Sequence, residues 1–467
     1  MVRLNLGTFA ASLPKTLPPC VVVDIVSQCP NLNAHEYVRG RHQNGAILPF
    51  QESDLFELQF RSRRQLCFGD DVRPAYEIAF YCDPKDGLPF PPGSALGVIC
   101  PNVRNDVDAM LKLLNFRGDE HIHISSIGTN AKVKARFERS FSYIPKHCSV
   151  REILENVLDL RTVLKKAFLK ILGDCCPEGS SDRRQLHELS STNQEAYRSE
   201  VLEGRMMIFD LLEKFPTCRP GLAVLVEYLN RLSPRFYSVS NYSVNEIRFI
   251  YRPMEFVSQG RVLTGQCSTM LALLQRDASD NLETKLNKLM LDATHSTYSS
   301  RSTVMCYLRE NVRNFNFPAK PTIHFMFVCH GTGIAPFSAY LQWLRSTPTA
   351  KPNAFWLYYG CRYASRDALF DLEAVRESGC RLEVRQSRAD ASVLGGTMVK
   401  RGYVQDALLE CTNDVRKHLV TDSGELLICG DFQTMAKDTL AVLGKILGAE
   451  TVDSLLRQNR IKLDVWT

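Results

Sequence analysis

No run of apolar residues in this chain is long enough to cross a membrane. A transmembrane helix needs roughly 20 apolar residues in succession. The longest runs here are far shorter, so the sequence predicts no membrane span. A long basic run is also missing, and the net charge of +6 on 467 residues is mild. Basic tails and patches that bind nucleic acid are built from such runs, so we expect no nucleic-acid partner.

Cysteine pairs with metal-binding or redox spacing are absent, although the chain has 16 cysteines. No Cys-x-x-Cys occurs, and Cys175 and Cys176 are the only adjacent pair. Because no export signal is visible, we expect reduced thiols, no zinc or other metal site, and a cytoplasmic location. What remains is an ordinary globular composition, 45% hydrophobic and 23% charged. The length gives room for about two or three domains.

A glycine turn is the most informative segment that is present. An apolar run over 322–327 leads into Gly331-Thr332-Gly333, and Pro336 follows near the start of an expected helix. Free backbone N–H groups at the positive end of a helix suit a phosphate. The alternative is a strand–helix turn whose glycines serve geometry alone.

Two upstream segments also suit a ligand with a flat ring and phosphates. Arg235 and Tyr237 alternate in a strand-like run, so both side chains point to one face. A guanidinium for an anion and a ring for stacking are then adjacent, although an edge strand with an exposed arginine would look the same. Gly265 precedes an expected helix, where N–H groups and hydroxyls could hold a second phosphate. An ordinary helix cap is the alternative there.

The C-terminal part adds two more signals. Cys429 ends a buried strand-like run, and Gly430 would let a ligand approach the end of that strand. Trp466 lies one residue from the end of the sequence, where chains usually fray. Its ring is explained by packing on something flat, or by filling a core.

Taken in order along the chain, these motifs resemble the FAD/NADPH half of the diflavin reductases, which are ferredoxin–NADP reductase-like enzymes that also carry an FMN domain. The resemblance covers roughly residues 49–467. Pro92-Gly93 followed by the segment 98–102 is similar to the methionine synthase reductase branch. Further matching segments are Tyr359-Gly360-Cys361-Arg362, Ser387-Arg388, Tyr403-Val404-Gln405, Cys429-Gly430-Asp431 and Asp464-Val465-Trp466.

The resemblance implies an α+β multidomain fold, with an antiparallel FAD-binding β-barrel, an all-helical insertion, and a doubly wound parallel α/β NADP-binding domain. Strands alternating with helices after residue 320 agree with the last part. The expected boundaries are 1–48 for a lead-in without a flavodoxin domain, 49–103 and 233–318 for the two parts of the barrel, 104–232 for the helical connecting insertion, and 319–467 for the NADPH-binding domain.

The resemblance also implies the roles of single residues, with hydride passing from NADPH to FAD before electrons leave singly. The residues expected in catalysis are Ser238, Cys429, Asp464 and Trp466. Those expected to bind a cofactor are Arg235, Tyr237, Ser238, Gly265, Gln266, Cys267, Ser268, Gly331, Thr332, Gly333, Cys361, Arg362, Ser387, Arg388, Arg401, Tyr403, Gln405, Asp431 and Trp466. Cys329-His330 stands where the family commonly has Gly-Pro, which puts a bulkier, titratable group at the dinucleotide turn.

An FMN domain is expected of the family but is not visible in this chain. A flavodoxin-like domain needs on the order of 150 residues, and only the lead-in precedes the expected barrel. We therefore expect FAD and NADPH sites here, with an FMN domain able to act in trans. The favoured partner is cobalamin-dependent methionine synthase, which implies a role in methionine biosynthesis. The alternatives are a haem, sulfite or iron–sulfur redox partner, or a truncated, non-catalytic paralogue.

Overall fold

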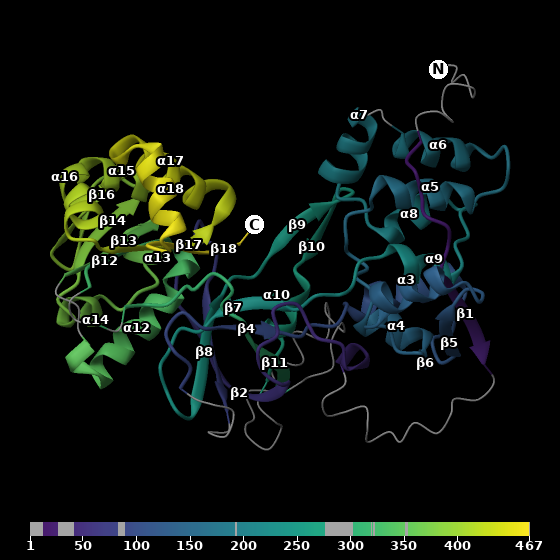
Figure 1. The fold of residues 1–467 in the computed structure, drawn as a ribbon, viewed down its shortest axis with the longest axis horizontal. Helices are drawn as coiled ribbons and strands as arrows, with labels where there is room; N and C mark the ends of the chain where they lie inside the picture. Colours follow the sequence, from purple (N-terminus) through teal and green to yellow (C-terminus); the bar gives the residue numbers. More distant parts are fainter. Residues whose placement is uncertain are drawn as a thin grey trace.

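The computed structural model describes residues 13–26, 42–82, 89–191, 194–275, 302–318, 320, 323–350 and 354–466. Most of the expected lead-in, 1–12 and 27–41, therefore lies outside the described residues. Three parts lie side by side across the molecule: a parallel sheet with helices, a central antiparallel sheet, and a mainly helical part (Figure 1). No described helix combines the length and apolarity needed to span a bilayer.

The central sheet has six antiparallel strands in the order β7-β4-β11-β2-β3-β8. Its edge strands come together at a bridge between Val239 and Phe249, so the sheet curls back on itself as a barrel requires. Gly97 of β4 lies against the ring of Tyr307, where a Cβ would come within 2.4 Å of the ring. The strands are β2 (Phe56–Gln65), β3 (Tyr76–Tyr81), β4 (Ala95–Val98), β7 (Arg235–Ser238), β8 (Glu246–Tyr251) and β11 (Thr303–Arg309).

A hairpin extends from this sheet toward the helical part, and a short helix follows it and packs back against the sheet (Figure 1). The hairpin is β9 (Glu255–Ser258) and β10 (Arg261–Thr264), and α10 (Gln266–Ala272) follows it directly. Cys267, Met270 and Leu271 of α10 belong to the apolar core inside the central sheet. The helix is therefore fixed against the sheet by its buried face.

The helical part surrounds a core of its own, separate from the other cores. Its helices are α2 (Arg104–Leu114), α3 (Ala131–Phe141), α4 (Val150–Asn156), α5 (Lys166–Asp174), α6 (Ser181–Ser190), α7 (Gln194–Ala196), the π-helix η4 (Tyr197–Glu203), α8 (Ile208–Lys214) and α9 (Leu222–Tyr228). The 3-10 turn η2 (His42–Gly45) precedes the central sheet.

The expectation of an all-helical insertion was wrong. This part contains an antiparallel sheet of β1 (Val21–Val26), β5 (His121–Ser126) and β6 (His147–Ser149). Ile122 and Ile124 are buried, while His121 and His123, which alternate with them, face the other side. The alternation is short and polar, and its partner β1 lies about a hundred residues earlier, so the local sequence carries little sign of a strand.

The parallel sheet has the order β15-β16-β14-β13-β12-β17-β18, with only the edge strand β15 antiparallel. Separate apolar cores lie on its two faces, as a doubly wound sheet requires. The strands are β12 (Phe325–His330), β13 (Phe355–Cys361), β14 (Arg381–Gln386), β15 (Ser392–Leu394), β16 (Thr397–Arg401), β17 (Glu425–Asp431) and β18 (Ile461–Trp466).

Helices connect these strands on both sides (Figure 1). They are α12 (Ala335–Ser346), α13 (Ala364–Asp367), α14 (Leu372–Glu377), α15 (Val404–Glu410), α16 (Thr412–Arg416), α17 (Lys437–Leu447) and α18 (Ala449–Arg457). Short 3-10 or π segments are η5 (Gly331–Ile334), η6 (Pro348–Ala350), η7 (Lys417–Thr421) and η8 (Phe432–Ala436). The turns η5 and η8 follow the central strands β12 and β17, so they lie at the carboxyl edge where ligands of such sheets bind.

Candidate functional site

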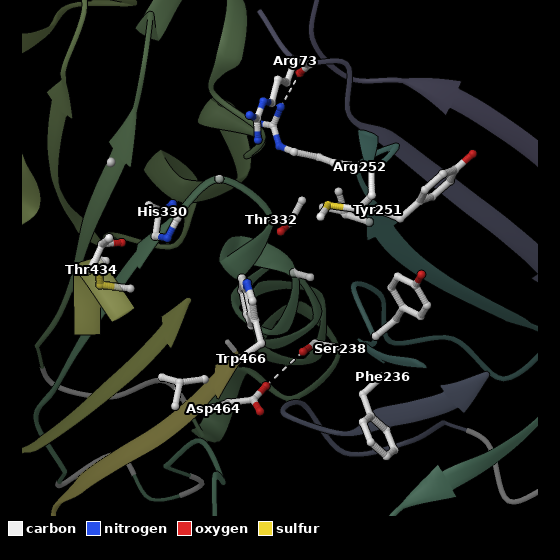
Figure 2. A pocket seen from close by; sticks show the side chains of 18 of the residues that line it. Arg73, Phe236, Ser238, Tyr251, Arg252, His330, Thr332, Thr434, Asp464 and Trp466 are labelled. Carbon is white, nitrogen blue, oxygen red and sulfur yellow. Dashed lines mark hydrogen bonds between the residues drawn. The ribbon is translucent and has the colours of Figure 1, made fainter. Parts of the chain in front are cut away.

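A cavity of about 1290 Å³ lies where the central sheet meets the carboxyl edge of the parallel sheet. Pockets for a single drug-sized ligand are roughly 300–1,000 Å³, so this one has room for parts of two large cofactors. Figure 2 shows Arg73 and Arg252 at the top of the cavity, and Trp466, Ser238 and Asp464 at the bottom.

Most residues expected from the sequence to bind cofactors line this one cavity. They are Arg235, Tyr237, Ser238, Gly265, Gln266, Cys267, Ser268, Gly331, Thr332, Cys361, Arg362, Ser387, Tyr403, Gln405 and Trp466, together with Asp464. Five expected residues do not line it. Gly333 and Cys429 are buried behind its wall, Arg388 and Arg401 are exposed outside it, and Asp431 is half-buried at the start of η8.

Ser238 and Asp464 meet across the boundary between the two sheets. Ser238 Oγ donates a hydrogen bond to Asp464 Oδ2 over 3.0 Å. The other carboxylate oxygen accepts from Arg309 Nη1 over 3.2 Å. The side chain of Asp464 is only 11% exposed, and a carboxylate that far from water needs such a cation. The serine hydroxyl is therefore oriented by a buried, charge-balanced group.

Cys429 lies beside this pair. Its Sγ is 3.9 Å from Asp464 Oδ2, because Cys429 and Asp464 are partners in the register of β17 and β18. Burial first, and then the charge of Asp464, raises the pKa of the Cys429 thiol well above its usual value. Cys429 therefore stays protonated, as a weak donor rather than a nucleophile.

Two aromatic side chains, Tyr237 and Trp466, line the cavity. Tyr237 is stacked on Phe249 with the ring centroids 4.7 Å apart, and burial raises its pKa, so the phenol is neutral. Trp466 ends β18 and is 42% exposed. Both rings are suited to stacking on a flat ligand.

Arg235 brings a cation to the same space. Its Nη1 donates to Ser233 O over 2.6 Å and its Nη2 lies 3.4 Å from Gln266 Oε1. Gln266 is held in turn through its Nε2, which donates to Asn102 Oδ1 over 2.6 Å. Within the described residues no carboxylate lies at ion-pair distance from Arg235, so its charge is available to an anion in the cavity.

The dinucleotide turn η5 depends on its two glycines for different reasons. Gly331 has a φ of +51°, in the left-handed region that favours glycine. A Cβ on Gly333 would lie 2.3 Å from the carbonyl oxygen of Cys429, so this glycine lets η5 contact β17 directly. His330 Nε2 accepts the Asp431 N–H over 3.3 Å. Burial lowers the pKa of His330, which keeps the imidazole neutral for that role.

The family resemblance implies that Ser387, Arg388, Arg401 and Tyr403 hold the 2′-phosphate of NADPH, and of these Ser387 and Tyr403 line the cavity. Gln405 also lines it, and the Oε1 of Gln405 is buried with no hydrogen-bond partner in the described structure. Arg401 forms an ion pair with Asp390 over 3.3 Å. This buried amide oxygen leaves an acceptor position open to a water or to a polar ligand.

Sequence reasoning missed several charged residues at the site, among them Arg73, Arg252, Arg309 and Asp367. All four line the cavity. A cation directly after the strand-like run 246–251 could have drawn attention to Arg252. The other three carry no local signal, because their positions depend on tertiary contacts.

Comparison with known proteins agrees with both halves of this site. Residues 48–270 match the FAD binding domain family, and residues 327–440 match the oxidoreductase NAD-binding domain family. Methionine synthase reductase of Bos taurus is 30% identical over 487 aligned residues, covering 98% of this chain and 68% of the relative. The chain belongs to the diflavin reductase family. The reductase accordingly binds FAD and NADPH and is an NADPH-dependent oxidoreductase.

Other relatives show how widely this half is shared. Methionine synthase reductase of Homo sapiens is 28% identical across 98% of the chain and 68% of its own length. NADPH–cytochrome P450 reductase of Mus musculus is 29% identical across 69% of the chain and 47% of its own length. The shared region is the FAD-binding and NADP-binding half, which agrees with the resemblance found from the motifs.

Proposed function

We propose that the reductase passes electrons from NADPH through FAD to a protein partner of the methionine synthase reductase type. The observation that carries this proposal is the convergence of Ser238, Asp464 and Trp466 on one cavity, with the Cys429 thiol directly behind Asp464. NADPH and FAD supply a two-electron hydride step followed by one-electron steps, and the protein supplies orientation and electrostatics.

The residues present fit these two cofactors. Tyr237 and Trp466 offer stacking faces, and Arg235 offers a cation near the start of α10. Gln405 offers a buried acceptor that has no hydrogen-bond partner among the described residues. In this assignment Arg235 and Gly265 to Ser268 hold the FAD diphosphate, while Thr332 and its neighbouring glycines hold that of NADPH. The six-stranded central sheet then serves as the FAD-binding barrel.

Ser238 and Asp464 act at the reacting end in this proposal. Asp464 holds the Ser238 hydroxyl in a fixed direction, and its negative charge favours the cationic form of an oxidised nicotinamide. Arg309 stays paired with Asp464 through the 3.2 Å hydrogen bond from its Nη1. Cys429 fills the space behind and presents a neutral S–H. In this assignment Trp466 would cover the face of the flavin ring on which the nicotinamide stacks. Trp466 would therefore have to move aside during turnover.

The finer choice of partner rests on the relatives. The methionine synthase reductases of Bos taurus and Homo sapiens align over 98% of the chain, whereas the P450 reductases of Mus musculus and Cavia porcellus align over 69% and 90% of it. This favours cobalamin-dependent methionine synthase as the partner. Another diflavin-type reductase with a different redox protein is the second candidate.

The test uses FAD-loaded protein mixed anaerobically with NADPH while the flavin absorbance is followed. Asp464→Asn should slow bleaching about 10- to 100-fold, because a hydrogen bond to a charged group contributes roughly 1.5–3 kcal/mol. Asp414→Asn is the control, since Asp414 is a surface carboxylate paired with Arg381 away from the cavity. The proposal would be refuted if the folded protein took up no FAD. It would also be refuted if NADPH did not bleach the absorbance of the bound flavin.

A further inference from the structure

Arg252 connects the two halves of the molecule at the top of the cavity (Figure 2). It directly follows β8 of the central sheet, yet its Nη2 lies 2.7 Å from Asp367 Oδ1 in α13 of the parallel-sheet half. The Asp367 side chain is only 5% exposed. Its second oxygen accepts the backbone N–H of Arg362 over 3.1 Å. The ion pair is therefore shielded from water and fixed on both sides.

The guanidinium of Arg252 lies over the dinucleotide turn. A Cβ placed on Gly331 would be 3.8 Å from Arg252 Nη2 and 4.0 Å from Arg252 Nε. These two nitrogens form the edge of a guanidinium that binds an anion with two parallel hydrogen bonds. Nη1 is already used, because it donates to the carbonyl oxygen of Arg73. The Nε–H has no partner within the described structure, and Nη2 carries a second N–H.

The surroundings have more positive charge than their carboxylates balance. Arg73 and Arg362 also line the cavity, and no carboxylate of the described residues lies at ion-pair distance from either side chain. Burial, followed by the charges of Arg388, Arg73 and Arg252, lowers the pKa of Arg362. A desolvated group of cations beside free backbone N–H groups is a site for a polyanion.

We propose that Arg252 is a ligand for the diphosphate of the nicotinamide dinucleotide, contributed by the FAD-binding half, and that Asp367 is the residue that positions it. The inference rests on the proposed function, because it assumes that the dinucleotide lies along η5. Both halves of the molecule then hold the same diphosphate, so dinucleotide binding strengthens the contact between them. The diphosphate is common to NADPH and NADH, so Arg252 contributes to both equally.

The test compares two ligands on the FAD-loaded protein by calorimetry. NADP⁺ carries the diphosphate, whereas adenosine 2′-monophosphate carries only the outer phosphate. Arg252→Leu should weaken NADP⁺ binding about 10- to 100-fold. The dissociation constant of adenosine 2′-monophosphate should change by no more than about twofold. Arg252→Lys keeps the charge but loses the two-pronged edge of the guanidinium. Its affinity for NADP⁺ should therefore lie between that of Arg252→Leu and that of the unchanged protein.

Arg366→Leu is the matched control. Arg366 also joins the two halves, through hydrogen bonds of 2.7 and 3.1 Å to Asp71, but it does not line the cavity. Arg366→Leu should leave the affinities for NADP⁺ and for adenosine 2′-monophosphate unchanged. The inference would be overturned if Arg252→Leu bound NADP⁺ as tightly as the unchanged protein. It would also be overturned if Arg252→Leu and Arg252→Lys each lost equal affinity for both ligands, since Arg252 would then have a structural role. If the unchanged protein itself binds no NADP⁺, the proposed function fails instead.

Discussion

At the scale of single residues, Arg388 is an expected ligand of the 2′-phosphate whose side chain is exposed outside the cavity. Its backbone N–H donates to Arg362 O over 3.1 Å, which fixes the main chain just after the end of β14 but not the guanidinium. The sequence identified Arg388 because it belongs to the short motif Ser387-Arg388, which occupies the expected place in the order of the family motifs. Its contact with a ligand is still a prediction.

Replacing Arg388 with alanine should raise the Michaelis constant for NADPH at least about tenfold and change that for NADH little. The reason is that an arginine–phosphate pair is a charge-assisted contact, and only NADPH carries the 2′-phosphate. Steady-state kinetics with both dinucleotides measure the two constants. Equal losses for NADPH and NADH would show that Arg388 has another role.

His418 is buried away from the cavity, and its pKa is lowered to about 4, first by burial and then by His324. The unfolded chain takes up this proton near the ordinary histidine pKa of about 6.5. Stability should therefore fall as the pH drops from about 6.5 to about 4, by at most about 1.4 kcal/mol for each pH unit. His418→Leu should flatten this part of the profile in urea unfolding. An unchanged slope would mean that other groups cause the loss.

Among the site residues, the sequence identified those that lie in local motifs. Ser238 and Gly265 are examples, since each is part of a short segment with its own pattern. Arg252 and Asp367 were missed because they are 115 residues apart and meet only through tertiary packing. The environment of Cys429 is likewise set by the register of three strands, which no local spacing encodes.

At the scale of elements, the parallel strands were predicted well and the helices of the insertion less so. The pattern over residues 381–386 predicts a strand, and β14 has those bounds. The apolar spacing over residues 150–172 predicts one helix, but the structure has α4 ending at Asn156 and α5 beginning at Lys166. Leu158, Leu160 and Leu164 between them are buried. The apolar spacing thus continues through an irregular segment, and periodicity alone cannot tell such a segment from a helix.

The contact between η5 and β17 gives an element-scale prediction. Gly333→Ala should push the dinucleotide turn away from β17, because the added Cβ would lie 2.3 Å from the Cys429 carbonyl oxygen. We expect a loss of about 1–3 kcal/mol in unfolding free energy, as for overpacked cores, with weaker NADP⁺ binding. Urea unfolding and calorimetry measure the two effects.

Gly444→Ala is the matched control for this substitution. Gly444 lies inside α17, and no atom is within 4 Å of an added Cβ. Alanine should stabilise this helix by up to about 1 kcal/mol, because glycine is a poor helix former. If Gly333→Ala were as well tolerated as Gly444→Ala, close packing of η5 on β17 would not be what requires the glycine.

At the scale of the whole molecule, the cavity depends on how the two halves meet. The central sheet encloses a core of its own, whereas the core on one face of the parallel sheet also includes Cys67, Val72, Ala75 and Ile250 from the central part. The motifs predicted each half without the other. Their relative placement follows from contacts such as Ser238 with Asp464, 226 residues apart. This is why the sequence predicted most residues of the site but not the ion pair of Arg252 with Asp367, which joins the two halves at the top of the cavity.

The last prediction concerns where electrons leave this assembly. NADPH should reduce the bound FAD, and ferricyanide should then accept electrons, since a small acceptor can reach the cavity. Methionine synthase should be reactivated faster when a separate FMN domain is added, because the domain families matched by this chain are the FAD-binding and NAD-binding ones. Stopped-flow absorbance and methionine formation, with and without the FMN domain, measure this. Equal reactivation without it would mean that the reduced FAD passes electrons to the cobalamin enzyme directly, through the open face beside Trp466.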